Sequence, residues 1–174
     1  ARGFIRDARA KELAPRGTRV SCIRYGNVIS SRGAALHLFR RLGAEGKSIP
    51  ITDPRCTRFF LTMAQAVDCV LQALRDMRGG EILVPHLPAG RIMDLAEAVA
   101  AGRRYSIEET GMRPGGEKVH EALVGAEESA RTVRTDGWYV IEPALPMPWR
   151  PAWRGDLLPE WFEVRSDRAR RLTV

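Results

Sequence analysis

Short apolar runs of β-forming residues alternate with longer amphipathic segments along this chain, and this alternation is its strongest constraint on the fold. Two runs have the composition of buried strands, residues 19–24 and 81–84. Three segments carry apolar residues three or four positions apart, the spacing of an amphipathic helix: residues 34–44, 62–77 and 94–101. Strands that alternate with helices are typical of an α/β fold with a parallel sheet.

The remaining segments are assigned from turn residues and shorter patterns. Thr62 is expected to cap the helix that follows it, and Gly46 and Gly79-Gly80 to end the first two helices. Further elements are expected along the chain: the end of a helix at residues 4–13, a loop at 50–60, a strand at 105–110, a short helix at 117–124, a strand at 138–141 and coil from Pro143 onward.

Size and composition are those of an ordinary globular domain. The 174 residues are 44% hydrophobic, which is enough to bury a core. No apolar run reaches the roughly 18 residues that a membrane span needs, and no signal peptide is visible. We therefore expect no membrane partner and a cytoplasmic location. Because the first residues already follow a helical pattern, we also expect the chain to be a fragment.

The net charge of +7 comes almost entirely from arginine, since the chain has only three lysines. The arginines are scattered rather than gathered on one helix face, so we expect no nucleic-acid partner. The three cysteines lack metal-ligand spacing. Cys22 and Cys69 fall in apolar patterns, which favours buried free thiols in a reducing compartment over a metal site.

Arginine stands beside Gly, Pro or small polar residues in three separate blocks, the mixture that builds anion-binding loops. The blocks are residues 24–33, 50–60 and 113–121. Guanidinium groups bind phosphate with a fixed fork of donors, and loops after parallel strands form the ligand crevice of open α/β sheets. Three such loops predict a phosphorylated ligand that is held from several sides.

Each block also has a purely structural interpretation. Tyr25-Gly26-Asn27 can be a simple turn, although Gly26 would also let a ligand approach the backbone. Asp53 and Arg55 can form a surface ion pair, or Asp53 can orient an arginine or accept a hydrogen bond from a sugar or base. Glu117 can sit at a helix start, where the helix dipole favours it. His120 is interpreted as a structural hydrogen bonder rather than a base.

The motifs RYGNV, SRGA, PITDPRCTRFF, GGEILVP, DLAEA and RPGGEKVHE follow one another between Thr18 and Pro143. In this order and spacing the chain resembles the inverting UDP-N-acetylglucosamine 4,6-dehydratases, in the CapD-like polysaccharide-biosynthesis branch of the extended short-chain dehydrogenase/reductases. The resemblance implies the C-terminal part of a Rossmann-like fold with a small substrate-binding subdomain. Residues 1–102 would belong to the NADP-binding domain and residues 103–174 to the rest of the substrate-binding subdomain and a coil.

The resemblance also assigns roles to single residues. Tyr25 would lie by the nicotinamide of NADP, and Asn27 would serve both the cofactor and the sugar phosphate. Arg58 would contact the diphosphate of a UDP-sugar, Arg113 and Glu117 would hold the diphosphate and ribose, and the backbone of residues 50–52, with Ile51 and Thr52, would contact the uracil. The implied reaction oxidises C4 of the sugar, removes water across C5–C6 and returns the hydride at C6.

The sequence departs from the family at several points, and two of these departures bear on function. The GxxGxxG turn and the YxxxK catalytic pair are expected upstream of Ala1, so no catalytic residue is assigned and the chain by itself is expected to be inactive and aggregation-prone, with strands 19–24 and 81–84 as exposed edges. The Arg113 motif carries one glycine more than the usual Arg-Pro-Gly-Glu. A homo-oligomer is implied for the complete enzyme. The alternatives are a sugar-nucleotide epimerase and a non-catalytic UDP-sugar-binding module.

Overall fold

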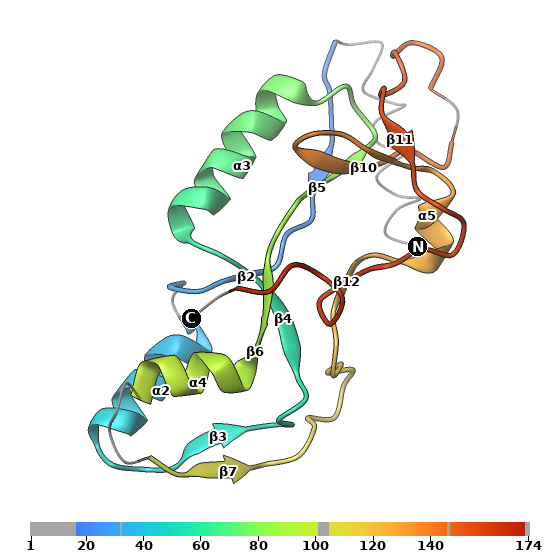
Figure 1. The fold of residues 1–174 in the computed structure, drawn as a ribbon. Coiled ribbons are helices and arrows are strands. Elements are labelled where there is room, and N and C mark those ends of the chain that lie inside the picture. Colours follow the sequence, from blue (N-terminus) through green and yellow to red (C-terminus); the bar gives the residue numbers. More distant parts are fainter. Residues whose placement is uncertain (1–16, 32, 101–104, 146, 173–174) are drawn as a thin grey trace. The chain divides into compact units, whose positions relative to one another are not determined.

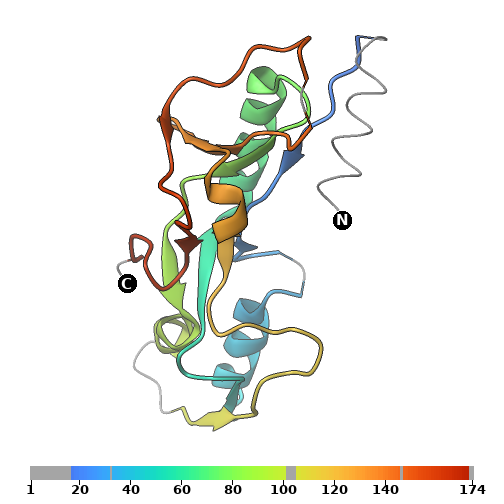
Figure 2. The same ribbon diagram turned by 90° about the vertical axis from the view of Figure 1, so that its right-hand side faces the viewer.

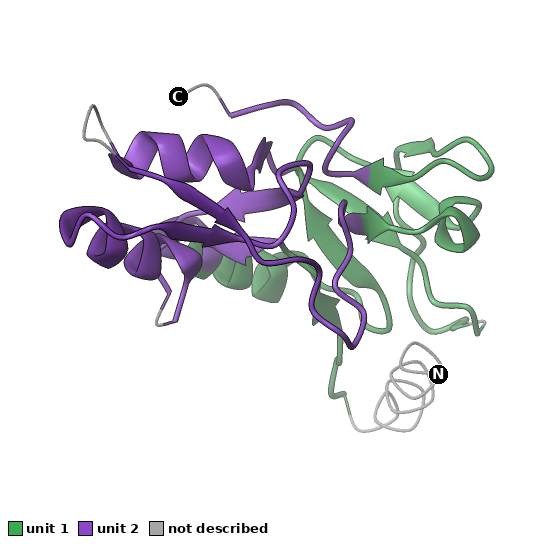
Figure 3. Cartoon of the chain, turned by 90° about the horizontal axis from the view of Figure 1, so that it is seen from below, with its two compact units in different colours: residues 1–25, 67–86, 123–164 green, residues 26–66, 87–122, 165–174 purple. Residues whose placement is uncertain are grey.

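The structure, a computed structural model, describes residues 17–31, 33–100, 105–145 and 147–172. Two compact units divide the chain, and each draws on three segments (Figure 3). Unit 1 comprises residues 1–25, 67–86 and 123–164, and unit 2 comprises residues 26–66, 87–122 and 165–174. The helix end predicted at residues 4–13 and the domain boundary predicted at residue 102 lie outside the described residues.

Unit 1 is built around a five-stranded mixed sheet. In spatial order its strands are β1 (Cys22–Ile23), β5 (Ile82–Pro85), β10 (Trp138–Ile141), β9 (Thr132–Arg134) and β11 (Asp156–Leu157). Only β1 and β5 run parallel, and the other neighbours are antiparallel. The strands predicted at 19–24, 81–84 and 138–141 are therefore confirmed. The prediction that residues 81–84 form an exposed edge is wrong, because β5 lies between β1 and β10.

Unit 2 combines two small sheets with two helices. β2 (Asn27–Val28) runs parallel to β4 (Thr57–Leu61), and β6 (Ala89–Arg91) pairs antiparallel with β4. β3 (Ile49–Ile51) runs parallel to β7 (Ile107–Glu109). The helices α2 (Ala35–Ala44) and α4 (Ile92–Ala100) lie side by side (Figures 1 and 2). Their buried core joins them to β3 through Phe39, Ile49, Ile51 and Ala96.

Three more elements of the described chain are short. The strands β8 (Ala122–Val124) and β12 (Val164–Arg165) form a two-stranded pair, and α5 (Ala126–Ser129) follows β8. The helices predicted at 34–44 and 94–101 and the strand predicted at 105–110 are confirmed as α2, α4 and β7 within the described residues.

The predicted cap at Thr62 is confirmed by two reciprocal hydrogen bonds. The backbone N–H of Gln65 donates to Thr62 Oγ1 at 3.2 Å, and the Thr62 N–H donates to Gln65 Oε1 at 2.8 Å. This capping box satisfies two donors at the start of α3 (Met63–Asp76). The apolar stripe of α3 is only partly covered, since Ala66 and Ala73 are buried whereas Val70 and Leu74 are exposed.

Three predicted segments differ from the structure. The coil predicted from Pro143 onward contains two short strands, β11 and β12. The loop predicted at 50–60 contains Ile51 at the end of β3 and most of β4, a strand whose first residues, Thr57 and Arg58, are polar but buried. The helix predicted at 117–124 is absent from this described segment, which is extended and ends in β8. Its backbone pairs with β4 instead, because the Thr57 N–H donates to the Val119 carbonyl at 3.0 Å.

The cysteines also differ from their prediction. All three are free, but Cys22 is exposed on β1, Cys69 is half-buried and only Cys56 is buried. Cys22 lies on β1, which is the edge strand of its sheet and has a neighbouring strand on one side only. The apolar sequence around Cys22 therefore predicted more burial than the structure shows.

Candidate functional site

A cavity of about 600 Å³ lies within unit 2, with walls from β2, α2, β3, β4, α4 and the loop that contains Arg113. It gathers the residues that the sequence assigned to the substrate from segments far apart in the chain. These residues are Asn27, Ile51, Thr52, Arg58, Arg113 and Glu117. Tyr25, which the sequence assigned to the cofactor, belongs to unit 1, where it is 39% exposed.

A second cavity of about 500 Å³ shares Asn27, Arg58, Arg113 and Glu117 with the first. Its remaining walls are the Pro114-Gly115-Gly116 turn, Lys118 and Glu121. The larger cavity also has apolar walls, formed by Val28, Ile29, Leu36, Phe39, Phe60, Ile92 and Leu95. The described residues of unit 2 thus combine an apolar cavity with a polar one around a shared group of charged side chains.

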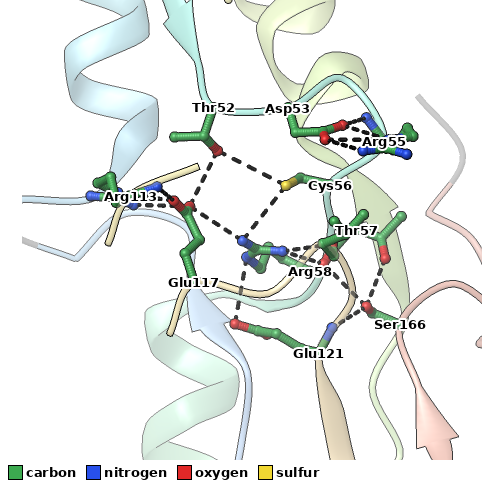
Figure 4. Close-up of polar contacts among 11 residues, drawn as sticks. Thr52, Asp53, Arg55, Cys56, Thr57, Arg58, Arg113, Glu117, Glu121 and Ser166 are labelled. Atoms are coloured by element: carbon green, nitrogen blue, oxygen red, sulfur yellow. Dashed lines mark hydrogen bonds and ion pairs between the residues drawn. The ribbon is translucent and has the colours of Figure 1, made fainter. Parts of the chain in front are cut away.

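Arg58 is the buried centre of this charged group (Figure 4). Its Nη1 donates to the carbonyl oxygens of Thr57 at 2.8 Å and Val119 at 3.0 Å. Its Nη2 lies 3.5 Å from Glu117 Oε1, and its Nε lies 3.5 Å from Glu121 Oε1. A guanidinium that is only 10% exposed is stable here because two carboxylates balance its charge.

Arg113 is the accessible arginine of the site, with a side chain that is 77% exposed. The Glu117 carboxylate accepts from the backbone N–H of Arg113 at 3.0 Å and from its Nε and Nη2, both at 3.2 Å. Thr52 Oγ1 donates to the same carboxylate at 3.2 Å. One face of Glu117 is therefore bound to Arg113 and Thr52, while the Arg113 guanidinium remains open to solvent.

The additional glycine of the Arg113 motif does not separate Arg113 from Glu117. Gly115 and Gly116 have φ angles of 106° and 101°, a backbone region that residues other than glycine rarely adopt. Two left-handed residues in succession tighten the turn and return Glu117 to the backbone of Arg113. The residue pair assigned from the sequence is thus brought together in spite of its longer spacing.

Glu121 is a member of the charged group that sequence reasoning missed. It lines the smaller cavity, and burial raises the pKa of its carboxyl while the Arg58 charge opposes this shift. Its position four residues after Glu117 in the same motif was the available signal. A helix at 117–124 would also have placed Glu117 and Glu121 on one face, but it gave no reason to pair this segment with β4, which is how the extended backbone brings Glu121 to Arg58.

The structure also shows the contacts of Asp53, His120 and Ile51. Asp53 accepts from Arg55 Nη2 at 2.6 Å and from its backbone N–H at 2.8 Å, which confirms the predicted pair with Arg55, and this arginine is 76% exposed. His120 Nδ1 lies 2.8 Å from Thr57 Oγ1, in accord with a structural hydrogen bond. The carbonyl of Ile51 accepts from the Thr110 N–H at 2.9 Å, which extends the β3–β7 pairing.

Gly26 allows a close approach, but of the protein's own backbone. A Cβ at this position would lie 2.4 Å from the Phe59 carbonyl oxygen and 2.5 Å from Phe59 Cβ. The glycine therefore lets β2 begin directly against β4, which places Asn27 opposite Phe60 in the sheet.

Acid is expected to weaken the Arg113–Glu117 pair. The Arg113 side chain, then its backbone N–H, lower the pKa of Glu117 from 4.5 to about 2. Because the folded-state pKa lies below the unfolded value, this stabilisation is complete above the unfolded pKa and is lost as the pH falls through the folded one.

We expect Glu117→Gln to flatten the acid dependence of the free energy of unfolding. Urea unfolding of both proteins at about pH 5 and about pH 3 measures this change across the window in which a depressed carboxyl titrates. Equal slopes with pH in the two proteins would contradict the assignment.

Comparison with known proteins assigns the chain to a family. Residues 4–143 match the family described as polysaccharide biosynthesis protein. The chain belongs to this family. The UDP-N-acetylglucosamine 4,6-dehydratase (inverting) of Campylobacter jejuni is 40% identical over 129 residues, which cover 74% of this chain and 38% of that protein. The UDP-glucose 4-epimerase of Rickettsia typhi is 38% identical over 136 residues, which cover 77% and 40% of the two chains.

The fold is similar to a solved structure as well. The X-ray structure of Pen from Bacillus thuringiensis matches 96% of this chain and 50% of its own, with a TM-score of 0.81 and 26% identity. With the family match, this confirms the predicted α/β, Rossmann-like fold class of the extended short-chain dehydrogenase/reductases. The chain spans 38–40% of the length of the curated relatives named above.

Among the described residues, no helix is both long and apolar enough to cross a membrane. In the same part of the chain, no three His, Cys, Asp or Glu side chains are grouped so that they could hold a metal ion.

Proposed function

We propose that this chain binds the UDP-sugar in a UDP-N-acetylglucosamine 4,6-dehydratase of polysaccharide biosynthesis. The observation that carries the proposal is the convergence of six separately assigned residues on one cavity of unit 2. The proposal is also supported by the 40% identity to the UDP-N-acetylglucosamine 4,6-dehydratase of Campylobacter jejuni. A cavity of about 600 Å³ is in the size range of small-molecule sites, which is roughly 300–1,000 Å³.

In this proposal the charged group binds the diphosphate. Arg113 offers an exposed fork of donors, and Asn27 lines both cavities beside it. Arg58 contributes a fixed positive charge from below the surface, because its Nη1 donors are already bound to backbone carbonyls. Fork-shaped donors suit the oxygen pairs of a diphosphate better than an ammonium group does.

The nucleoside would occupy the larger cavity. Its apolar walls suit a planar base, and the backbone of residues 50–52 forms one side of it. Thr52 and Glu117 are hydrogen-bonded to each other at 3.2 Å, so together they present an acceptor that is positioned for a ribose hydroxyl. Ile51 would contribute mainly through its buried side chain, because its carbonyl already accepts from the Thr110 N–H.

The cofactor of the proposed enzyme is NADP. The Tyr25 ring is partly exposed and can therefore contact a nicotinamide, and Asn27 is exposed at the start of β2. NADP supplies the hydride acceptor and donor for the reaction. Tyr25 and Asn27 would serve only to bind and orient it, and no catalytic residue is assigned to this chain.

A second candidate is a sugar-nucleotide 4-epimerase, favoured by the 38% identity to the Rickettsia typhi epimerase. A third is a UDP-sugar-binding module without catalysis. Product analysis by NMR separates these possibilities when the intact protein is incubated with NADP and UDP-N-acetylglucosamine. A 4-keto-6-deoxy sugar supports the dehydratase. A sugar inverted at C4 with its 6-hydroxymethyl group unchanged supports the epimerase, and UDP binding without turnover supports the module.

The proposal includes a cytoplasmic, homo-oligomeric enzyme without a nucleic-acid partner. The free state of all three cysteines supports the location. Against nucleic acid, several arginines are already paired with carboxylates rather than presented as an open basic face. These pairs are Arg24–Glu128, Arg58–Glu117, Arg91–Asp94, Arg113–Glu117, Arg134–Asp156 and Arg165–Asp167.

A further inference from the structure

Ser166 is a buried serine that lies outside the segment matched by the family, yet it contacts the candidate site directly. It is 3% exposed and follows β12 in the last described segment of unit 2. Its backbone N–H donates to the Glu121 carbonyl at 2.9 Å, and its Oγ accepts from the Glu121 N–H at 2.9 Å. Ser166 thus holds the backbone of Glu121 on both sides.

The same hydroxyl holds the residue that precedes Arg58. Ser166 Oγ donates to the Thr57 carbonyl at 3.1 Å and lies 2.7 Å from Thr57 Oγ1 (Figure 4). The Thr57 carbonyl also accepts from Arg58 Nη1 at 2.8 Å. One carbonyl oxygen therefore joins the serine to the guanidinium, with both of its lone pairs in use.

One assignment of the hydroxyl protons uses every one of these contacts. With the Ser166 proton on the Thr57 carbonyl, Thr57 Oγ1 donates to Ser166 Oγ. Thr57 Oγ1 then has no proton left for His120, and in this assignment His120 Nδ1 donates to it across 2.8 Å. The hydrogen bonds thus run from His120 through Thr57 Oγ1 and Ser166 Oγ to the Thr57 carbonyl, which also binds Arg58.

We propose that Ser166 is a positioning residue of the UDP-sugar site, which sets the guanidinium of Arg58 and the carboxylate of Glu121 relative to each other. This proposal rests on the proposed function. Its basis is that Ser166 joins the two segments from which these opposite charges face one another across 3.5 Å. Without the hydroxyl, the Thr57 carbonyl and the Glu121 N–H each lose a buried partner, and the two segments can shift apart.

The first test compares two buried serines. Ser166→Ala removes the hydroxyl at the site, and Ser129→Ala removes one in unit 1, where Ser129 Oγ donates to the Ala126 carbonyl at 2.7 Å. Both changes are expected to lower the urea midpoint of the intact protein. Only Ser166→Ala is expected to weaken UDP binding in calorimetry, by about five- to tenfold, as for a lost buried hydrogen bond.

Equal UDP affinities in the two variants would overturn the proposal. If the unaltered protein does not bind UDP, the proposed function itself fails, so the two failures are distinct.

The second test needs no substitution and therefore cannot fail through misfolding. Nitrogen-15 NMR of the unaltered protein at about pH 8, where an ordinary histidine is neutral, reports which ring nitrogen of His120 carries the proton. A protonated Nδ1 supports the chain of donors through Ser166. An unprotonated Nδ1 overturns it, because Thr57 would then donate to His120 and could not donate to Ser166.

Discussion

Replacing Arg58 by methionine is expected to weaken UDP binding by about a hundredfold and to lower the free energy of unfolding by about 2–3 kcal/mol. The stability loss arises because Glu117 and Glu121 would face each other without the positive charge between them. Loss of one partner from a buried ion pair costs about 3–5 kcal/mol. We expect less here because Glu117 keeps its contacts with Arg113 and Thr52. Calorimetry with UDP and urea unfolding measure the two effects.

The matched control is Arg55→Met, three residues earlier in the chain. Arg55 also pairs with a carboxylate, but its side chain is 76% exposed and does not line either cavity. An exposed pair contributes about 0–1 kcal/mol, so this variant should bind UDP normally and lose little stability. Arg58→Lys keeps the charge, but one ammonium group cannot bind the Thr57 and Val119 carbonyls while it also faces both carboxylates, and we expect this variant to lose most of the affinity. Equal UDP affinity in the Arg55 and Arg58 variants would refute the role of Arg58.

Gly26→Ala is expected to destabilise the protein by about 3 kcal/mol, at the upper end of overpacking effects. The added Cβ would meet the carbonyl oxygen and Cβ of Phe59 at 2.4 and 2.5 Å. Backbone atoms cannot turn aside as a flexible side chain can, so β2 must move away from β4. Because Asn27 begins β2, UDP binding should weaken together with stability.

Gly43→Ala provides the control for Gly26→Ala. Gly43 lies within α2, and a Cβ there meets nothing within 4 Å. Alanine is favoured over glycine in helices by about 0.5–1 kcal/mol, so this variant should be as stable as the unaltered protein or more stable. Urea unfolding compares the two, and a Gly26 variant as stable as the Gly43 variant would show that β2 does not need the close approach.

The elements that the sequence predicted correctly are those whose apolar residues are also the buried ones. The helices α2 and α4 and the strand β10 were found from apolar spacing, because each buries a continuous apolar face or run. β4 was missed for the opposite reason. Thr57 and Arg58 are buried by hydrogen bonds and ion pairs, which a hydrophobic pattern cannot show.

Much of the candidate site could also be predicted, because its residues lie in short motifs whose order resembles a family. What the motifs could not show is how the charges balance. The helix wrongly predicted at 117–124 hid the pairing of Glu121 with Arg58. Ser166 had no sequence signal, since its partner Thr57 lies 109 positions away and only the fold joins them.

The charge balance changes how the predicted phosphate site is understood. Of the described arginines that line the two cavities, Arg113 alone has a largely exposed guanidinium. Arg58 already faces Glu117 and Glu121. A diphosphate that contacts the Arg58 guanidinium must therefore share it with these two carboxylates or displace one of them. The site therefore holds its buried charge stably before any ligand arrives, and affinity depends on how well the ligand competes.

The location of UDP on the protein tests the central claim most directly. Titration of the isotope-labelled intact protein with UDP, followed by amide chemical shifts, maps the residues that respond. We expect the largest changes on residues that line one cavity of unit 2, which are Asn27, Thr52, Arg58, Arg113 and Glu117. Saturable binding whose changes fall outside this cavity, or no binding of UDP, would contradict it.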